Sequence, residues 1–231
     1  MKTPTSLSIG GFVPLSTVDW PDQLAAVVFA RGCPWNCSYC HNPHLISGIA
    51  DDGETSWDEV RTFLGNRRGL LDGVVFSGGE PTAQAALPDA MREVHAMGFE
   101  VAVHTGGPSP DRFNDVLPLV DWVGFDVKAP FDEYERITRV ADSGQRALAS
   151  LSQLVASGTP FEVRTTVHPD LLDVDALKRM ADELRAAGVR RWVLQPYRSL
   201  GAREGLSAAR FHAGEVPEDL GDGFESLIIR T

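Results

Sequence analysis

The chain has 231 residues, 43% of them hydrophobic, which is enough to bury a sizeable core and argues against a disordered protein. It carries 32 acidic against 21 basic residues, a net charge of −11, and this balance argues against a nucleic-acid partner because phosphates attract basic surfaces. The sequence contains no run of about 18 apolar residues, so no membrane span is predicted. Its first ten residues are polar and predict no secretory signal. We therefore expect a cytoplasmic protein without membrane contact.

Short apolar runs alternate with helical segments along the chain. Six runs rich in Val and Phe are mostly apolar throughout, as expected for strands that are buried on both faces. The predicted strands are 25–30, 73–77, 100–104, 122–127, 161–167 and 192–195. Helices are predicted over about 56–64, 85–97, a short segment from Ser109, 145–156 and 173–187, with a weaker sixth beginning near Ser207.

This alternation predicts an α/β fold built on a parallel sheet with right-handed crossovers. No Pro/Ser-rich or single-charge tract divides the chain, so we expect one domain over residues 1–231. Six strand–helix units suit either an open doubly wound sheet or a partial barrel, and periodicity does not distinguish the two.

Polar and glycine-rich segments directly follow the predicted strands. In parallel α/β folds, the carboxyl ends of the strands form the edge where active sites are built. The sequence therefore predicts a site at this edge. The segments concerned are RGCPWNCSYCHN at 31–42, GGEPT at 78–82, TGG at 105–107, DVK at 126–128 and QPYR at 195–198.

All three cysteines lie within eight residues, in a C-x3-C-x2-C pattern at Cys33, Cys37 and Cys40. An odd, clustered set is typical of a metal site in a reducing compartment rather than of disulfides. Three thiolates could bind a [4Fe–4S] cluster and leave one iron open to a small molecule. A zinc site completed by His41 or His44 is the alternative, since structural zinc usually has four protein ligands.

The cysteine motif, with the aromatic residue Tyr39 just before its third cysteine, resembles the radical S-adenosylmethionine (SAM) superfamily. The GGEP segment at 78–81 is similar to that family's GGE motif after the second strand. This resemblance implies a partial (β/α)6 barrel of the TIM type. It also implies that the three cysteines hold one [4Fe–4S] cluster whose open iron binds SAM.

The same resemblance implies contacts to SAM. Glu80 and the backbone of Gly78 and Gly79 would contact the methionine amino group, and glycine allows such a close approach. Tyr39 would lie beside the adenine. Thr105, which follows the third predicted strand, is a further candidate for binding the cofactor.

Three charged residues complete the set of cofactor-binding candidates. Asp126 and Lys128 share one strand face because side chains alternate with a period of two. They either contact SAM or pair with each other inside the barrel. Arg164 either holds the SAM carboxylate or forms a salt bridge at the barrel mouth.

Further segments resemble the activating enzymes of glycyl-radical enzymes. The match includes CHNP at 40–43, STVDWPD at 16–22, DVKAP at 126–130 and FEVRTTV at 161–167. Among these enzymes the sequence most resembles the anaerobic ribonucleoside-triphosphate reductase activating protein family. Within that family it resembles the branch that has a GGF opening, here at 10–12, and an LQ near the last strand, here at 194–195.

This family resemblance implies a reaction and two protein partners. A flavodoxin or ferredoxin-type donor would reduce the cluster, which would cleave SAM to methionine and a 5′-deoxyadenosyl radical. The radical would take a hydrogen from the Cα of one glycine of the partner, a glycyl-radical enzyme. We expect no catalytic residue beyond the cluster and SAM, so His41, His104 and His168 need not form a catalytic triad.

Two departures from related activases are visible. HTGG at 104–107 replaces a DTNG segment, so no monovalent cation site is predicted, and Arg198 stands where those enzymes have His. Three alternatives therefore remain. The chain could activate a pyruvate formate-lyase-like enzyme, act on a small molecule in the manner of 7-carboxy-7-deazaguanine synthase, or be a non-catalytic zinc-binding module.

Overall fold

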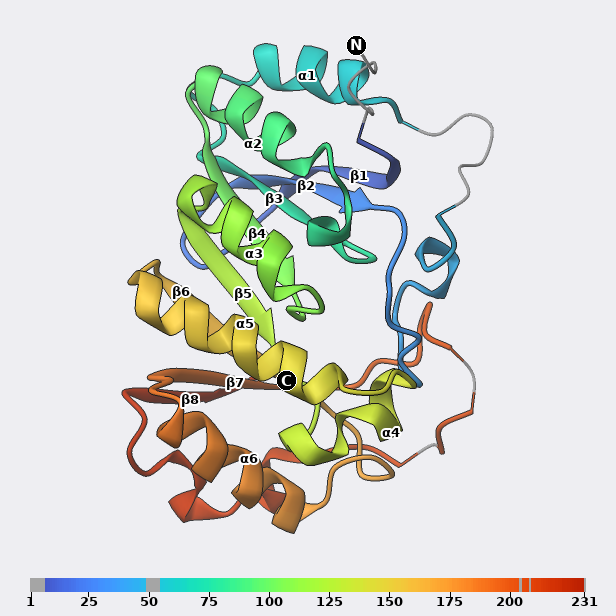
Figure 1. Cartoon of the computed structure of the whole chain (residues 1–231), viewed down its shortest axis with the longest axis vertical. Coiled ribbons are helices and arrows are strands. Elements are labelled where there is room, and N and C mark those ends of the chain that lie inside the picture. The colour runs from blue at the N-terminus through green and yellow to red at the C-terminus, as the bar shows by residue number, and fades with distance from the viewer. Residues whose placement is uncertain (1–6, 49–54, 204, 208, 231) are drawn as a thin grey trace. The chain divides into compact units, whose positions relative to one another are not determined.

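The computed structural model describes residues 7–48, 55–203, 205–207 and 209–230. Within these residues, eight strands form a sheet whose order follows the chain from β1 to β8 (Figure 1). None of the described helices combines the length and the apolar surface needed to cross a membrane. The strands are β1 (Ile9–Ser16), β2 (Ala25–Ala30), β3 (Gly73–Gly78), β4 (Glu100–Thr105), β5 (Trp122–Asp126), β6 (Phe161–Val167), β7 (Arg191–Pro196) and β8 (Ser226–Ile229). The α-helices are α1 (Trp57–Gly65), α2 (Leu87–Ala96), α3 (Pro110–Val116), α4 (Tyr134–Thr138), α5 (Ser143–Ser157) and α6 (Val174–Ala186).

The chain divides into two compact units, and each is described by itself. The first unit contains residues 1–34, 44–105 and 111–124. The second contains residues 35–43, 106–110 and 125–231.

The first unit is built on β1 to β4. β1 runs antiparallel to β2, whereas β2, β3 and β4 are parallel, with Ala25 opposite Gly73 and Gly73 opposite Glu100. Trp20, from the segment before β2, stacks on Trp122 with ring centroids 6.0 Å apart and belongs to the buried core beneath these strands. The parallel strands bring their carboxyl ends to one edge of this unit.

The second unit is built on β6, β7 and β8, which are parallel (Figure 1). Trp192 of β7 is fully buried, and its indole N–H donates to the Thr165 hydroxyl at 2.9 Å. The short helix α4 packs against α5, and the side chain of Asp173 caps the first turn of α6. These contacts fix the segments that follow β5 and β6, next to the carboxyl ends of both strands.

The structure confirms the six predicted strands as β2 to β7 and the first five predicted helices as α1, α2, α3, α5 and α6. Ser56 and Glu59 form a capping box at the start of α1. Gly158 adopts a φ of +74° and ends α5. The burial of almost every residue of β2 and β5 agrees with strands covered on both faces.

Two strands and one helix were not predicted. β1 contains Gly10, Gly11 and Pro14, residues that are unfavourable in strands, and its pairing with β2 is irregular on both sides of 11–13. Proline is tolerated there because β1 is at the edge of the sheet. β8 and α4 span four and five residues, too few for a clear periodic pattern.

The predicted helix beginning near Ser207 is wrong. The N–H and hydroxyl of Ser207 both donate to the Asp170 carboxylate, at 2.8 and 2.9 Å, and this pairing holds the residue in a loop. Between Ser207 and β8, the described residues form only short 3-10 turns, at Ala213–Glu215 and Glu218–Gly221. A serine that serves as a local hydrogen-bond donor in a loop gives the same sequence pattern as a helix cap.

A substitution at Gly144 tests this description of the second unit. A Cβ at Gly144, near the start of α5, would collide with the Phe131 carbonyl oxygen. We expect Gly144→Ala to lower the free energy of unfolding by about 1–3 kcal/mol, because an overpacked site must shift its neighbours. Gly65→Ala, at the end of α1 with no atom within 4 Å of the new Cβ, is the matched control and should change it by less than about 0.5 kcal/mol. Urea titration measures both, and equal midpoints would contradict the tight contact.

Candidate active site

In the first unit, the end of β3 lies directly against the segment that leads to Cys33. The Gly79 N–H donates to the Ala30 carbonyl at 2.8 Å, and the Glu80 N–H donates to the Gly32 carbonyl at 2.9 Å. Gly78 has a φ of +107°, and a Cβ there would lie 2.6 Å from backbone atoms of Ala30. Only glycine permits this approach, so the two glycines are required for the backbone contact itself.

Glu80 is buried at this edge, with 3% of its surface exposed. Its Oε1 accepts hydrogen bonds from the Thr82 N–H at 3.0 Å, the Thr82 hydroxyl at 2.7 Å and the Thr105 hydroxyl at 2.8 Å. The structure therefore brings the predicted residues Glu80 and Thr105 together. Thr82 was not singled out from the sequence. Its position two residues after a carboxylate at a strand end was the only available indication.

Cys33 is at the boundary of the first unit and is half-buried. Its N–H donates to the Ile46 carbonyl at 3.2 Å, and the preceding Gly32 N–H donates to the Leu45 carbonyl at 2.7 Å. Two backbone hydrogen bonds thus hold the first cysteine in place before any metal is bound.

The other two cysteines belong to a loop of the second unit. Cys37 is buried, Cys40 is half-buried, and the Cys40 N–H donates to the Cys37 carbonyl at 3.3 Å. The loop is fastened to α4, because the N–H groups of Asn36 and Ser38 donate to the carbonyls of Thr138 and Ile137, at 2.9 and 3.0 Å. The short helix missed in the sequence therefore supports the cysteine motif.

Asp126 lies between two cations in the second unit. The Lys128 Nζ is 3.6 Å from Asp126 Oδ2, and the Arg164 Nε is 3.2 Å from Asp126 Oδ1. The ammonium of Lys128 also lies 5.9 Å from the ring centroids of both Trp35 and Tyr39. The ion pairs of Asp126 with Lys128 and Arg164 are present in the structure, and a contact of these residues with SAM stays a prediction.

These contacts shift the pKa values of Cys37, Tyr39 and Lys128. Burial raises the pKa of the Cys37 thiol, and the positive charge of Lys128 opposes part of that rise. Burial likewise raises the pKa of the Tyr39 phenol, so this ring is neutral. Burial disfavours the charge of Lys128, but acidic neighbours, above all the carboxylate of Asp126, outweigh it and hold the pKa of the ammonium well above its usual value.

His41 and His104 each have a hydrogen-bond partner within their own unit. His41 accepts a hydrogen bond at Nε2 from the Arg198 N–H, at 3.4 Å, and its ring lies 5.4 Å from that of Tyr197. His104, which replaces an expected Asp, is buried with its Nε2 2.7 Å from the Asp19 carbonyl oxygen. It holds the segment that carries Trp20, which is a structural use.

Sequence comparison now identifies the family. The profile of the radical SAM superfamily matches residues 27–184, more than half of the chain, and includes all three cysteines and the GGE segment. The chain belongs to the radical SAM superfamily. The family implies a [4Fe–4S] cluster and SAM as cofactors.

Two relatives place this radical SAM chain more closely. It is 29% identical over 187 residues to a protein of Methanocaldococcus jannaschii named as a glycyl-radical enzyme activating enzyme, covering 77% of this chain and 75% of the relative. It is 30% identical over 196 residues to the pyruvate formate-lyase-activating enzyme of Clostridium pasteurianum, covering 81% and 80% of the two chains. The chain is therefore a member of the glycyl-radical-enzyme activating family of radical SAM enzymes.

Solved structures agree with this assignment at the level of the fold. The structure of TYW1 with a bound lysine–pyruvate adduct superposes with a TM-score of 0.60 at 16% identity, covering 83% of this chain and 70% of that chain. The predicted α/β fold, with the mostly parallel sheet of radical SAM partial barrels, is confirmed.

The residues of the cysteine loop suit an iron–sulfur cluster. Cys37 and Cys40 are not joined in disulfides. The buried indole N–H of Trp35 and the hydroxyl of Ser38 have no hydrogen-bond partner, and cluster sulfurs accept hydrogen bonds from such groups. No three His, Cys, Asp or Glu side chains of the described residues form a group that could hold a metal ion, so the cluster assignment rests on the motif and the family.

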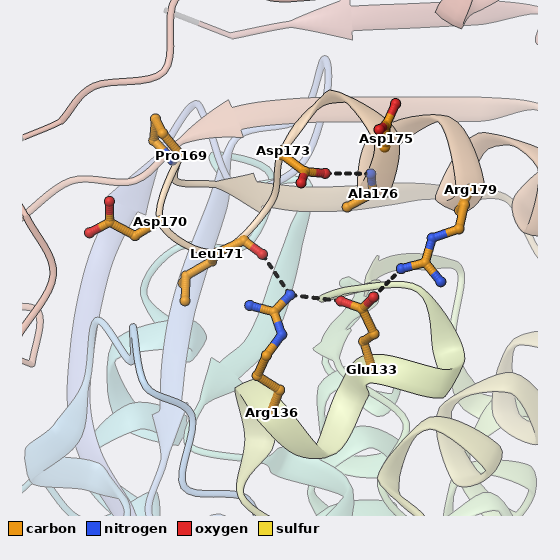
Figure 2. Close-up of a pocket in the computed structure, with 9 residues that line it drawn as sticks. All are labelled: Glu133, Arg136, Pro169, Asp170, Leu171, Asp173, Asp175, Ala176 and Arg179. Atoms are coloured by element: carbon orange, nitrogen blue, oxygen red, sulfur yellow. Dashed lines mark hydrogen bonds and ion pairs between the residues drawn. The ribbon is translucent and has the colours of Figure 1, made fainter.

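A pocket of about 350 Å³ also lies beside the carboxyl ends of β5 and β6, in the second unit (Figure 2). Glu133 pairs with Arg136 at 2.8 Å and with Arg179, and Asp173 accepts from the Ala176 N–H at 2.7 Å. No predicted site residue lines the pocket, and Glu133, Arg136 and Arg179 are paired with one another. We do not assign it to the active site of the radical SAM enzyme.

The influence of Lys128 on Cys37 can be measured in the cluster-free protein. Lys128→Met removes the charge that opposes the raised pKa of the Cys37 thiol, so less thiolate should be present. We expect alkylation of Cys37 by iodoacetamide at pH 8 to slow by roughly threefold to tenfold. Mass spectrometry of the Cys37 peptide reports the rate, and Lys178→Met on the exposed face of α6 is the control. An unchanged or faster rate in Lys128→Met would refute the electrostatic coupling.

Proposed function

We propose that this radical SAM enzyme activates anaerobic ribonucleoside-triphosphate reductase by taking a hydrogen from one glycine Cα of that protein. The observation that carries the general activity is the match to named activating enzymes over three quarters or more of each chain. The finer choice of partner is supported by GGF at 10–12 and LQ at 194–195. The electron would come from a flavodoxin or ferredoxin-type protein.

The cysteines are the proposed cluster ligands. Cys33, Cys37 and Cys40 would each bind one iron of a [4Fe–4S] cluster and leave the fourth iron for SAM. When bound, the cluster and SAM supply the reductive cleavage that yields the 5′-deoxyadenosyl radical. The contribution of the loop is to fix its cysteines through the backbone hydrogen bonds to α4 and to keep Cys37 away from water.

The GGE segment is the proposed site for the methionine end of SAM. The backbone of Gly78 and Gly79 and the carboxylate of Glu80 would hold the amino group, because a buried carboxylate binds an ammonium strongly. Tyr39, neutral and 6% exposed, would lie beside the adenine. Neither role requires a proton to move.

The charged group of the second unit is the proposed site for the rest of the cofactor. Arg164 would hold the carboxylate of SAM, and Asp126 and Lys128 would contact it as a pair. The side chains of Arg164 and Lys128 are 9% and 13% exposed, so water screens little of the attraction between these cations and a bound anionic group. We further propose that residues 1–231 act as a single core domain, since the family profile spans segments of both units.

A second candidate partner is a pyruvate formate-lyase-like enzyme. Relatives in Clostridium pasteurianum and Streptococcus mutans are named pyruvate formate-lyase-activating enzymes, at 30% and 26% identity. The replacement of DTNG by HTGG at 104–107 counts against this partner, because the His104 ring is hydrogen-bonded to the Asp19 carbonyl. The third possibility, a small-molecule substrate, is distinguished by the radical assay below.

Removal of single cysteines tests the cluster ligands. We expect Cys33→Ala, Cys37→Ala and Cys40→Ala each to lose most of the iron bound after anaerobic reconstitution, because no fourth cysteine is available as a substitute. Asn36→Ala, an exposed residue of the same loop, should keep the iron of the parent protein. Iron assay and absorbance at about 400 nm measure the outcome. A single cysteine variant that keeps a full cluster would remove that residue from the ligand set.

The protein substrate is tested by electron paramagnetic resonance. Reduced enzyme, SAM and anaerobic ribonucleotide reductase should give a doublet glycyl radical that is lost in the three cysteine variants. Pyruvate formate-lyase is the comparison substrate and should give a weaker signal or none. A radical on pyruvate formate-lyase alone would select the second candidate. Turnover of a small molecule in proportion to SAM, with no protein radical, would reject both activase proposals.

A further inference from the structure

The buried carboxylate of Glu80 is held by residues to which the family resemblance gave no supporting role. Glu80 follows β3 and caps the 3-10 turn Pro81–Ala83, where its side chain accepts the Thr82 N–H. An ionised carboxylate that is 3% exposed is unfavourable unless hydrogen-bond donors surround it. The neighbours of Glu80 must therefore supply these donors.

Two threonine hydroxyls supply them, and both bind the same oxygen. Oε1 accepts from the hydroxyls of Thr82 and Thr105, at 2.7 and 2.8 Å, and from the Thr82 N–H at 3.0 Å. Both threonines are 2% exposed, so water does not replace these donors when they are removed. Three donors on one oxygen fix the plane and the direction of the carboxylate.

The donors come from separate segments of the chain. Thr82 belongs to the turn after β3, and Thr105 is the last residue of β4, 25 positions from Glu80. The parallel pairing of β3 and β4 brings the two strand ends together. The orientation of Glu80 is thus determined by the register of the sheet and not by its own turn alone.

We infer that Thr82 and Thr105 are positioning residues that hold Glu80 in the direction in which it binds a cationic group of the substrate, the amino group of SAM. The inference rests on the proposed role of Glu80. Thr105 then acts through Glu80, and its effect on SAM binding requires the carboxylate to be present. A direct contact between Thr105 and SAM makes a different prediction, because its effect would persist without that carboxylate.

A double-mutant cycle separates these cases. SAM affinity is measured by anaerobic equilibrium dialysis on reconstituted enzyme, with iron content and thermal unfolding recorded for each variant. We expect Thr105→Val to weaken SAM binding about threefold to tenfold, the loss of one hydrogen bond to a charged group. Thr105→Ser, which keeps the hydroxyl, should restore the affinity to within about twofold. In the Glu80→Gln background, Thr105→Val should have little further effect.

Controls keep the test decisive. Thr82→Val and Thr82→Ser repeat the cycle with the second hydroxyl, in case Thr105→Val fails to fold. Thr62→Val removes an exposed hydroxyl of α1 that bonds the Asp58 carbonyl, and it should leave SAM affinity unchanged. Equal losses from Thr105→Val with Glu80 and with Gln at position 80 would overturn the inference.

The outcome for Glu80 alone distinguishes the inference from the proposal beneath it. If Glu80→Gln weakens SAM binding while both Thr→Val variants bind SAM normally, the positioning role is wrong and the role of Glu80 stands. If Glu80→Gln binds SAM as well as the parent enzyme, the proposed contact of Glu80 with SAM is wrong, and the positioning inference falls with it.

Discussion

The backbone contact between the end of β3 and the segment before Cys33 is the constraint on which the first unit depends. Two consecutive residues there must lack side chains, because Gly78 and Gly79 lie against the backbone of Ala30 and Gly32. This contact leaves the next residue, Glu80, buried at the edge of the sheet. A buried carboxylate requires hydrogen-bond donors, and the hydroxyls of Thr82 and Thr105 supply them. The glycines, the carboxylate and the hydroxyls are therefore successive consequences of one close approach.

In the second unit, the main constraint is the pairing of charged side chains next to the cysteine loop. Asp126 is one carboxylate between two cations, Lys128 and Arg164, and Lys128 also faces the rings of Trp35 and Tyr39. Aromatic faces stabilise a cation without adding a second carboxylate. The arrangement keeps positive charge beside the cysteine loop, where thiolates must form for metal to bind. A paired Asp on each cation would have cancelled that charge.

Much of the fold was predictable, because strands buried on both faces are visible as apolar runs. The prediction was wrong where local chemistry overrode the pattern, as at Ser207, whose hydroxyl serves Asp170 and not a helix. It was incomplete at β1, where glycine and proline conceal an edge strand. The site was predictable in its ligands, since cysteine spacing and the GGE segment reveal the chemistry. Its supports, Thr82 and α4, were not, because a threonine or a single helical turn has no pattern of its own.

The motifs that indicate the family do not all carry information about the protein partner. The VDWP segment resembles glycyl-radical activases, yet Trp20 stacks on Trp122 in the core and Asp19 is held by His104. Trp20 and Asp19 therefore have a structural use in this chain that does not depend on its substrate. Part of the CHNP segment at 40–43 also has a structural use, since His41 packs against Tyr197 and accepts a hydrogen bond from the Arg198 N–H. Arg198, in the QPYR segment at 195–198, is exposed, and its side chain is not part of this packing.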